Sequence, residues 1–116
     1  MSRRYDMHIA VKGLKEEHKA LVEESISTKW NADYGFMEPI EEDGESTWQF
    51  LTGGEGSLCG GETEEEFTGR VAESIWEALG YYVSVIVTAT YLEDLPHETL
   101  SMEEEEYAGY LKRICT

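Results

Sequence analysis

The chain has 116 residues and a formal net charge of −16 at pH 7, from 25 acidic residues against nine Lys and Arg. A hydrophobic content of 41% predicts a folded chain, and the length is that of one domain. No long apolar run and no secretory signal are present, so we expect no membrane-spanning segment and a cytoplasmic location. The charge also disfavours direct contact with nucleic acid or an anionic membrane.

The negative charge is unevenly distributed along the chain. Residues 1–30 are nearly neutral, whereas residues 31–111 contain twenty acids and a single base, Arg70. Self-repulsion of this size destabilises a compact state. We therefore expect the acidity to serve an interaction, with solubility as the simpler explanation.

The first elements are predicted from two periodicities. Residues 5–11 alternate apolar and polar side chains, which indicates a half-buried strand. Apolar residues then recur at steps of three and four, which predicts an amphipathic helix over about residues 14–30. His18 lies on the apolar side of that helix, and we expect it to be a partly buried helix residue and not a ligand.

A β-hairpin is predicted next. Residues 34–40 are rich in aromatic side chains, and Pro39 favours an edge position. Asp43-Gly44 is a strong turn signal, and residues 47–52 form the return strand, with Trp48 and Phe50 on one face. The predicted tip carries four acids: Glu41, Glu42, Asp43 and Glu45.

Residues 53–66, GGEGSLCGGETEEE, combine glycines with glutamates. A glycine-rich loop before a helix suits phosphate binding, but these carboxylates would repel an anion. We expect a connecting loop that leads into a helix capped by Thr63 and Glu66 and ended by Gly80. The acids at this helix start are Glu62, Glu64, Glu65 and Glu66.

The last third of the chain begins with the longest β-branched and aromatic run. Residues 81–92 are predicted to form a strand, and residues 93–100 to be extended and irregular. A short helix over about residues 102–114 has acids at its start and Lys112 and Arg113 at its end, which is the favourable order for the helix dipole. Its acids are Glu103, Glu104, Glu105 and Glu106.

This order of elements predicts an α+β fold of the ferredoxin-like, split βαββαβ type. Four antiparallel strands in the order 4-1-3-2 would carry two helices on one face, with a short C-terminal helix added. Residues 81–92 would form one edge of the sheet. We expect a single domain over residues 1–116, with a core of about residues 4–92 and an acidic C-terminal extension, residues 93–116.

The other face of that sheet is predicted to be open. It would show five polar residues: His8, Lys12, Gln49, Ser84 and Thr88. An RNA-binding sheet of this type carries exposed aromatic and basic side chains, and the pattern offers few of either.

Enzymatic chemistry is not predicted. The three histidines fall on different elements, and no nucleophile, metal or cofactor motif is present. Cys59 and Cys115 are expected to be free thiols, because no disulfide framework or CxxC spacing exists. We expect no metal and no cofactor.

In size, charge and expected fold, the chain resembles the small acidic inhibitors of phages and mobile elements, the DNA-mimicking anti-CRISPR and anti-restriction proteins. This resemblance is to a class and not to an alignable family. It implies a protein that presents the three acid clusters given above to the Lys/Arg-rich surface of a nucleic-acid-binding complex and blocks DNA binding. Two alternatives stay open: a small assembly protein that forms a homodimer through its sheet, and a ferredoxin-like ligand-binding regulatory module.

Overall fold

The computed structural model describes residues 3–30, 32, 34–42, 44–58, 62–91 and 97–114. The elements follow the order β1 (Arg3–Leu14), η1 (Glu16–His18), α1 (Lys19–Ser27), β2 (Tyr34–Glu42), β3 (Glu45–Leu58), α2 (Glu64–Leu79), β4 (Ser84–Tyr91), β5 (His97–Met102) and α3 (Glu104–Ile114). η1 is a single 3-10 turn that leads into α1.

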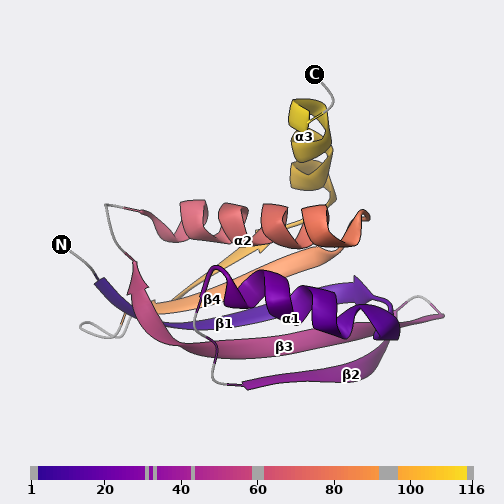
Figure 1. Ribbon diagram of the computed structural model, residues 1–116, viewed down its shortest axis with the longest axis horizontal. Coiled ribbons are helices and arrows are strands. Elements are labelled where there is room, and N and C mark those ends of the chain that lie inside the picture. The colour runs from indigo at the N-terminus through magenta and orange to yellow at the C-terminus, as the bar shows by residue number, and fades with distance from the viewer. Residues whose placement is uncertain are drawn as a thin grey trace.

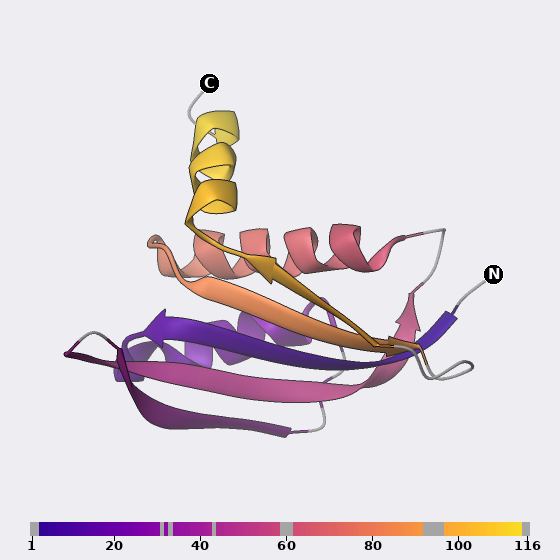
Figure 2. The same ribbon diagram turned by 180° about the vertical axis from the view of Figure 1, so that it is seen from behind.

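The five strands form one sheet in the order β2-β3-β1-β4-β5, and each pair of neighbours is antiparallel. Helices α1 and α2 lie side by side on one face of this sheet, as Figure 1 shows. Seen from behind, the strands lie in front of α1, and no helix of the described chain crosses that face (Figure 2). We call this uncovered surface the open face.

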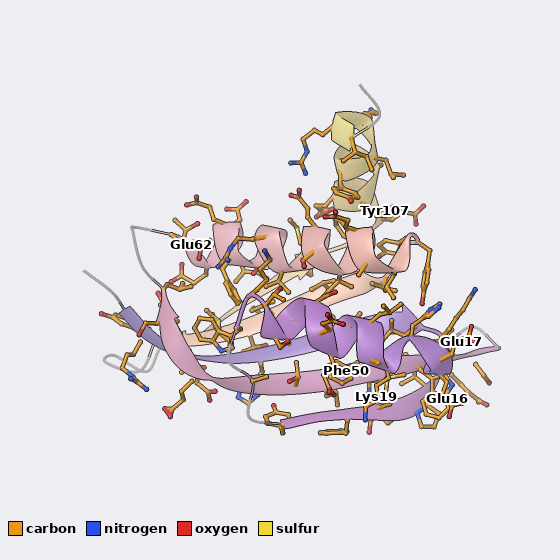
Figure 3. All side chains as sticks on the ribbon, in the orientation of Figure 1. Glu16, Glu17, Lys19, Phe50, Glu62 and Tyr107 are labelled. Atoms are coloured by element: carbon orange, nitrogen blue, oxygen red, sulfur yellow. The ribbon has the colours of Figure 1, made fainter. Side chains whose placement is uncertain are left out.

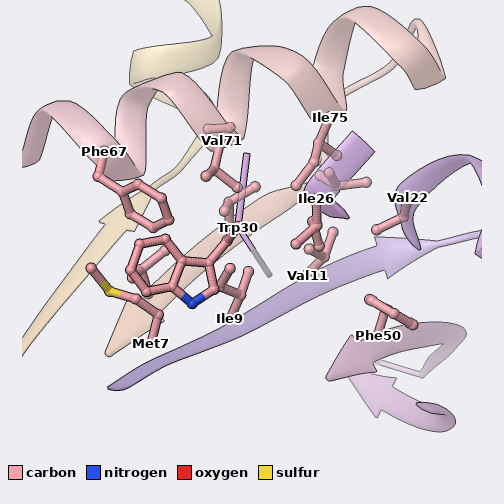
Figure 4. Close-up of a cluster of buried hydrophobic side chains, with 14 of the residues drawn as sticks. Met7, Ile9, Val11, Val22, Ile26, Trp30, Phe50, Phe67, Val71 and Ile75 are labelled. Carbon is pink, nitrogen blue, oxygen red and sulfur yellow. The ribbon is translucent and has the colours of Figure 1, made fainter. Parts of the chain in front are cut away.

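The hydrophobic core lies between the sheet and the two helices. Met7, Ile9 and Val11 of β1 point toward the helices because every second residue of a strand faces the same way. Val22 and Val71 meet them from α1 and α2 (Figure 4). The α2 helix packs on the sheet through one apolar stripe, whose buried residues are Phe67, Val71, Ala72, Ile75 and Trp76.

Helix α3 stands upright on α2 (Figure 1). Its two tyrosines, Tyr107 and Tyr110, pack against Trp76 of α2. The centroid of the Trp76 ring lies 5.2 Å from that of Tyr107 and 5.6 Å from that of Tyr110. Trp76 is itself fixed, because its indole Nε1 donates to the carbonyl oxygen of Val83 at 2.9 Å. The C-terminal helix therefore docks through an aromatic contact with the core.

Several expectations from the sequence are confirmed. The protein is α+β with one antiparallel sheet, β2 is an edge strand, and β2, β3, β1 and β4 lie in the predicted order. Thr63 and Glu66 form the expected capping box, and Gly80 ends α2 in the left-handed conformation with φ of 77°.

The predicted count of four strands is wrong. Part of the segment expected to be irregular forms β5, which pairs along β4 from Val85↔Met102 to Thr90↔His97. Residues 81–92 are therefore not an edge, and the strand within them is β4. A long β-branched strand offers unpaired N–H and C=O groups along its free side, and the following segment satisfies them.

The prediction that the glycine-rich stretch is a connecting loop is wrong for residues 53–58, which belong to β3. β3 continues through Gly53, Gly54 and Gly56 to Leu58 and stays in register with β1 along this whole length. Aromatic side chains take the space that side chains at Gly53 and Gly56 would fill. A Cβ atom on Gly56 would come within 2.8 Å of the Trp30 ring, and the Trp30 Nε1 donates to the carbonyl oxygen of Gly54 at 2.8 Å.

Two helices are shorter than predicted. β1 runs through Leu14, so the helical segment starts only at Glu16, and α1 ends at Ser27. The last helix starts at Glu104 because Met102 is the end of β5. His18 is partly buried in η1 as expected, and its Nδ1 lies 2.9 Å from the Tyr81 hydroxyl.

Candidate binding surfaces

The acids predicted at the hairpin tip lie at one end of the sheet. Glu41 is exposed near the end of β2, and Glu42 pairs with Glu45 in the backbone register of the hairpin. Asp43 lies outside the described residues. The tip is therefore an acidic end of the hairpin.

The acids at the start of α2 have structural partners. Tyr5 donates a hydrogen bond from its hydroxyl to Glu64, and Glu66 accepts from the backbone N–H of Thr63 at 3.2 Å. Glu62 receives two hydrogen bonds from Arg70, at 2.9 and 3.0 Å. Of the four predicted residues, Glu65 is the one whose side chain is exposed with no such contact in the described chain.

The predicted clusters do not merge into one patch. α2 begins at the end of the molecule opposite the tip of the β2–β3 hairpin (Figure 1). In Figure 3, Glu62 lies at one end, while Glu16 and Glu17 lie at the other. The acids at the start of α3 form a third group near the C-terminal half of α2 (Figure 1).

A broader pattern unites the helical acids. Nine glutamates on the helices are exposed and have no side-chain hydrogen bond or ion pair among the described residues. We call them the helix-side acids: Glu16, Glu17, Glu23, Glu24, Glu65, Glu77, Glu104, Glu105 and Glu106. Four of them, on η1 and α1, come from the nearly neutral N-terminal segment, so the segmental charge count could not single them out.

An open groove of about 910 Å³ runs along α2 beside α3. Four glutamates line it, together with Lys29, Arg70 and Tyr110, and Arg113 pairs with one of them, Glu73, at 2.9 Å. The glutamates are Glu62, Glu66, Glu73 and Glu77. Burial, with Glu77 and Glu73 nearby, raises the pKa of the Tyr110 hydroxyl above its usual value. This α2 groove is of mixed charge.

The open face holds a feature that the sequence analysis missed. Tyr34 and Phe36 of β2 are 43% and 46% exposed there, and their rings stack with centroids 6.2 Å apart. They border a hollow of about 460 Å³, lined mostly by apolar side chains of β1, β3 and β4 and also by His8 and Thr88. The alternation of Tyr34, Phe36 and Glu38 was the available signal, but it does not say which side faces the helices.

A chain of hydrogen bonds borders this hollow. Nε2 of His8 lies 3.1 Å from Oδ2 of Asp6, and Nδ1 lies 2.9 Å from the Tyr34 hydroxyl. The carboxylate favours a proton on Nε2, so Nδ1 accepts from Tyr34. Burial, with the charge of Asp6 nearby, raises the pKa of Tyr34, which therefore stays a hydrogen-bond donor at neutral pH.

Other kinds of site are not evident in the described chain. Within these residues, no three His, Cys, Asp or Glu side chains are grouped to hold a metal ion. Among the described helices, none has the length and apolar content needed to cross a membrane. Cys59 and Cys115 lie outside the described residues, so the expected free thiols stay a prediction.

Comparisons with known proteins identify a fold. No protein-family model and no curated protein matches the sequence. A solved phage SAM lyase in its apo state has a similar structure, with a TM-score of 0.51 over 87% of this chain and 90% of that chain. The sequence identity is 17%, so the likeness is one of fold.

Proposed function

We propose that the protein is a non-enzymatic acidic binding protein of phage or mobile-element origin. Its helix-side acids would occupy the cationic nucleic-acid-binding surface of a host defence complex and block DNA binding. The observation that carries the proposal is the set of nine exposed glutamates without ion-pair partners in the described chain. Because no positive side chain neutralises these carboxylates within the protein, their electrostatic attraction is available to a partner.

The structure changes which residues should contribute. Glu64 accepts a hydrogen bond from Tyr5 and Glu66 accepts one from the Thr63 backbone N–H, so charge reversal there would also weaken the start of α2. Glu104, Glu105 and Glu106 are exposed on α3, which stands away from the sheet (Figure 1). We therefore assign the main contact to α3 and the exposed side of α1, with the hairpin tip as a separate contact.

A displacement assay tests this function. Labelled DNA is bound to each of a panel of purified restriction endonucleases and CRISPR effector complexes, and the protein is added. We expect displacement from at least one of them, and we expect the combined Glu104→Gln, Glu105→Gln and Glu106→Gln variant to displace less. The matched control removes three charges from the strands, by Asp6→Asn, Glu38→Gln and Glu55→Gln. Equal loss in both variants would contradict a helix-side contact.

The fold likeness favours a second candidate, a protein that binds or cleaves SAM. SAM is a sulfonium cation, and the α2 groove offers it the carboxylate of Glu77 beside the hydroxyl of Tyr110, whereas Glu73 is paired with Arg113. Incubation with SAM, followed by chromatography and calorimetry, tests this candidate. Consumption or binding that is lost in Glu77→Gln supports it. SAM that is neither consumed nor bound rejects it.

We also propose that β1, α1, β2, β3, α2 and β4 form a ferredoxin-like unit to which β5 and α3 are added. The order of these elements and the position of both helices on one face support this classification. A ligand-binding regulatory module of this type would respond to the same SAM-binding measurement, through binding without consumption.

A further inference from the structure

Two adjacent rows of residues cross the centre of the open face from one edge to the other. The strand register places one row at Phe36, Leu51, Ala10, Ile86 and Ser101. It places the next at Tyr34, Gly53, His8, Thr88 and Thr99. Neither row contains an acidic residue, although 25 of the 116 residues are acidic. The centre of this face is thus apolar, aromatic and hydroxyl-bearing.

This central region has no cover in the described chain. Phe36 is 46% exposed, and the hollow of about 460 Å³ lies over Leu51 and Ile86. Both helices that pack on the sheet are on the other side (Figure 2). An antiparallel sheet commonly leaves one face to solvent, but that face then carries polar residues in alternation. A row of four apolar residues is typical of a face that packs against another surface.

The edges of the sheet are less suited to association. β5 occupies the free side of β4, so the apolar strand that could have paired with another chain is already paired. At the opposite edge, β2 contains Pro39, which cannot donate a backbone hydrogen bond to an added strand. Association through the sheet is therefore favoured at its open face.

The distribution of charge indicates which kind of molecule would bind to the open face. A cationic partner would be attracted to the helix-side acids and not to rows without carboxylates, and an anionic partner would be repelled by a net charge of −16. A second copy presents the same uncharged centre. The acidic helices of that second copy would lie on the far side of its own sheet, about 10 Å beyond the contact surface. This distance is about one Debye length at physiological salt, so the repulsion between the two copies is partly screened.

We propose that the open face is the surface through which copies of this chain associate, with the Phe36 row at the centre of the contact. Phe36, Leu51 and Ile86 of one copy pack on the same row of the other. This inference does not depend on the proposed function, because the helix-side acids stay exposed in the assembly.

Sedimentation of the full chain over a concentration series, at about 0.1 M and about 1 M salt, tests the proposal. We expect a dimer or a larger closed assembly that becomes tighter at high salt, since screening removes the repulsion between two acidic molecules. Phe36→Glu should weaken association by more than about tenfold, because it buries an unpaired charge. Leu21→Glu is the matched control, because Leu21 is an exposed apolar residue (41%) on α1.

A fold control and a second variant of the same row make the result of this experiment unambiguous. Circular dichroism shows whether each variant keeps its fold, and Leu51→Lys provides a second disruption of the same row. Tighter association at high salt that is lost in Phe36→Glu and Leu51→Lys but kept in Leu21→Glu supports the proposal. A monomer under all conditions overturns it, and so does an assembly that only Leu21→Glu disrupts.

Discussion

The hydroxyl of Tyr34 lies 2.9 Å from Nδ1 of His8, although the two residues are on strands separated by β3. Gly53 lies between them in the register, and its missing side chain lets the Tyr34 side chain cross β3. A Cβ at this position would come within 2.8 Å of the Tyr34 hydroxyl and 2.6 Å of the Met7 carbonyl oxygen. Glycine is therefore required at residue 53 by its neighbours and not by its own backbone conformation.

We predict that Gly53→Ala destabilises the protein by about 1–3 kcal/mol, because Tyr34 and the β1 backbone must both move. Chemical denaturation monitored by tryptophan fluorescence measures the change. Gly109→Ala is the matched control, because no atom lies within 4 Å of a Cβ added there. That variant should be as stable as the parent or slightly more stable, since alanine favours the α3 helix. Equal effects in the two variants would contradict the packing described for Gly53.

The capping box at the start of α2 gives a second prediction. Thr63→Ala removes the oxygen that accepts from the Glu66 backbone N–H, and it should cost about 1 kcal/mol of unfolding free energy. Glu66→Gln should cost less, because glutamine can still accept from the Thr63 backbone N–H. Thermal melts of both variants and of Glu65→Gln, which changes a neighbouring exposed residue, make the comparison. A Thr63→Ala variant as stable as Glu65→Gln would show that the cap is unimportant.

Alkaline pH should weaken the fold. Burial raises the pKa of Tyr34, Tyr81, Tyr82 and Tyr110 in the folded state above the usual value of about 10. The unfolded chain then loses these protons first, so stability is complete below about pH 10 and falls as pH rises through the folded-state pKa values. Denaturation at several alkaline pH values, with phenolate absorbance recorded in parallel, tests the sign. Tyr110→Phe should reduce the loss, and an unchanged pH profile would contradict the assignment.

The sequence predicted most of the secondary structure because strong local patterns specify it. The alternation in β1 and the Thr63 cap belong to segments whose local preference and final environment agree. The glycines of residues 53–56 are the opposite case, because their local preference is for a loop. The Trp30 ring and the Tyr34 hydroxyl, which belong to residues distant in sequence, lie where Cβ atoms at residues 56 and 53 would be, and this favours a strand of glycines.

The candidate surfaces were less predictable for a related reason. A run of glutamates shows where charge lies along the chain, but not that Glu64 contacts Tyr5 or that Glu73 pairs with Arg113. The acid-free rows of the open face come from five strands, and they become visible only when the register is known. Both surfaces depend on contacts between distant segments.

The salt dependence of DNA displacement tests directly whether carboxylates make the contact with the defence complex. Unmodified protein is titrated against labelled DNA on a restriction endonuclease or CRISPR effector complex that it displaces at low salt. At each salt concentration, the apparent affinity is corrected for the affinity of the complex for DNA alone. If the helix-side acids make the contact, the corrected affinity for the complex should fall steeply as salt increases, because screening weakens the attraction between carboxylates and Lys/Arg. A corrected affinity that stays constant with salt would contradict an electrostatic contact.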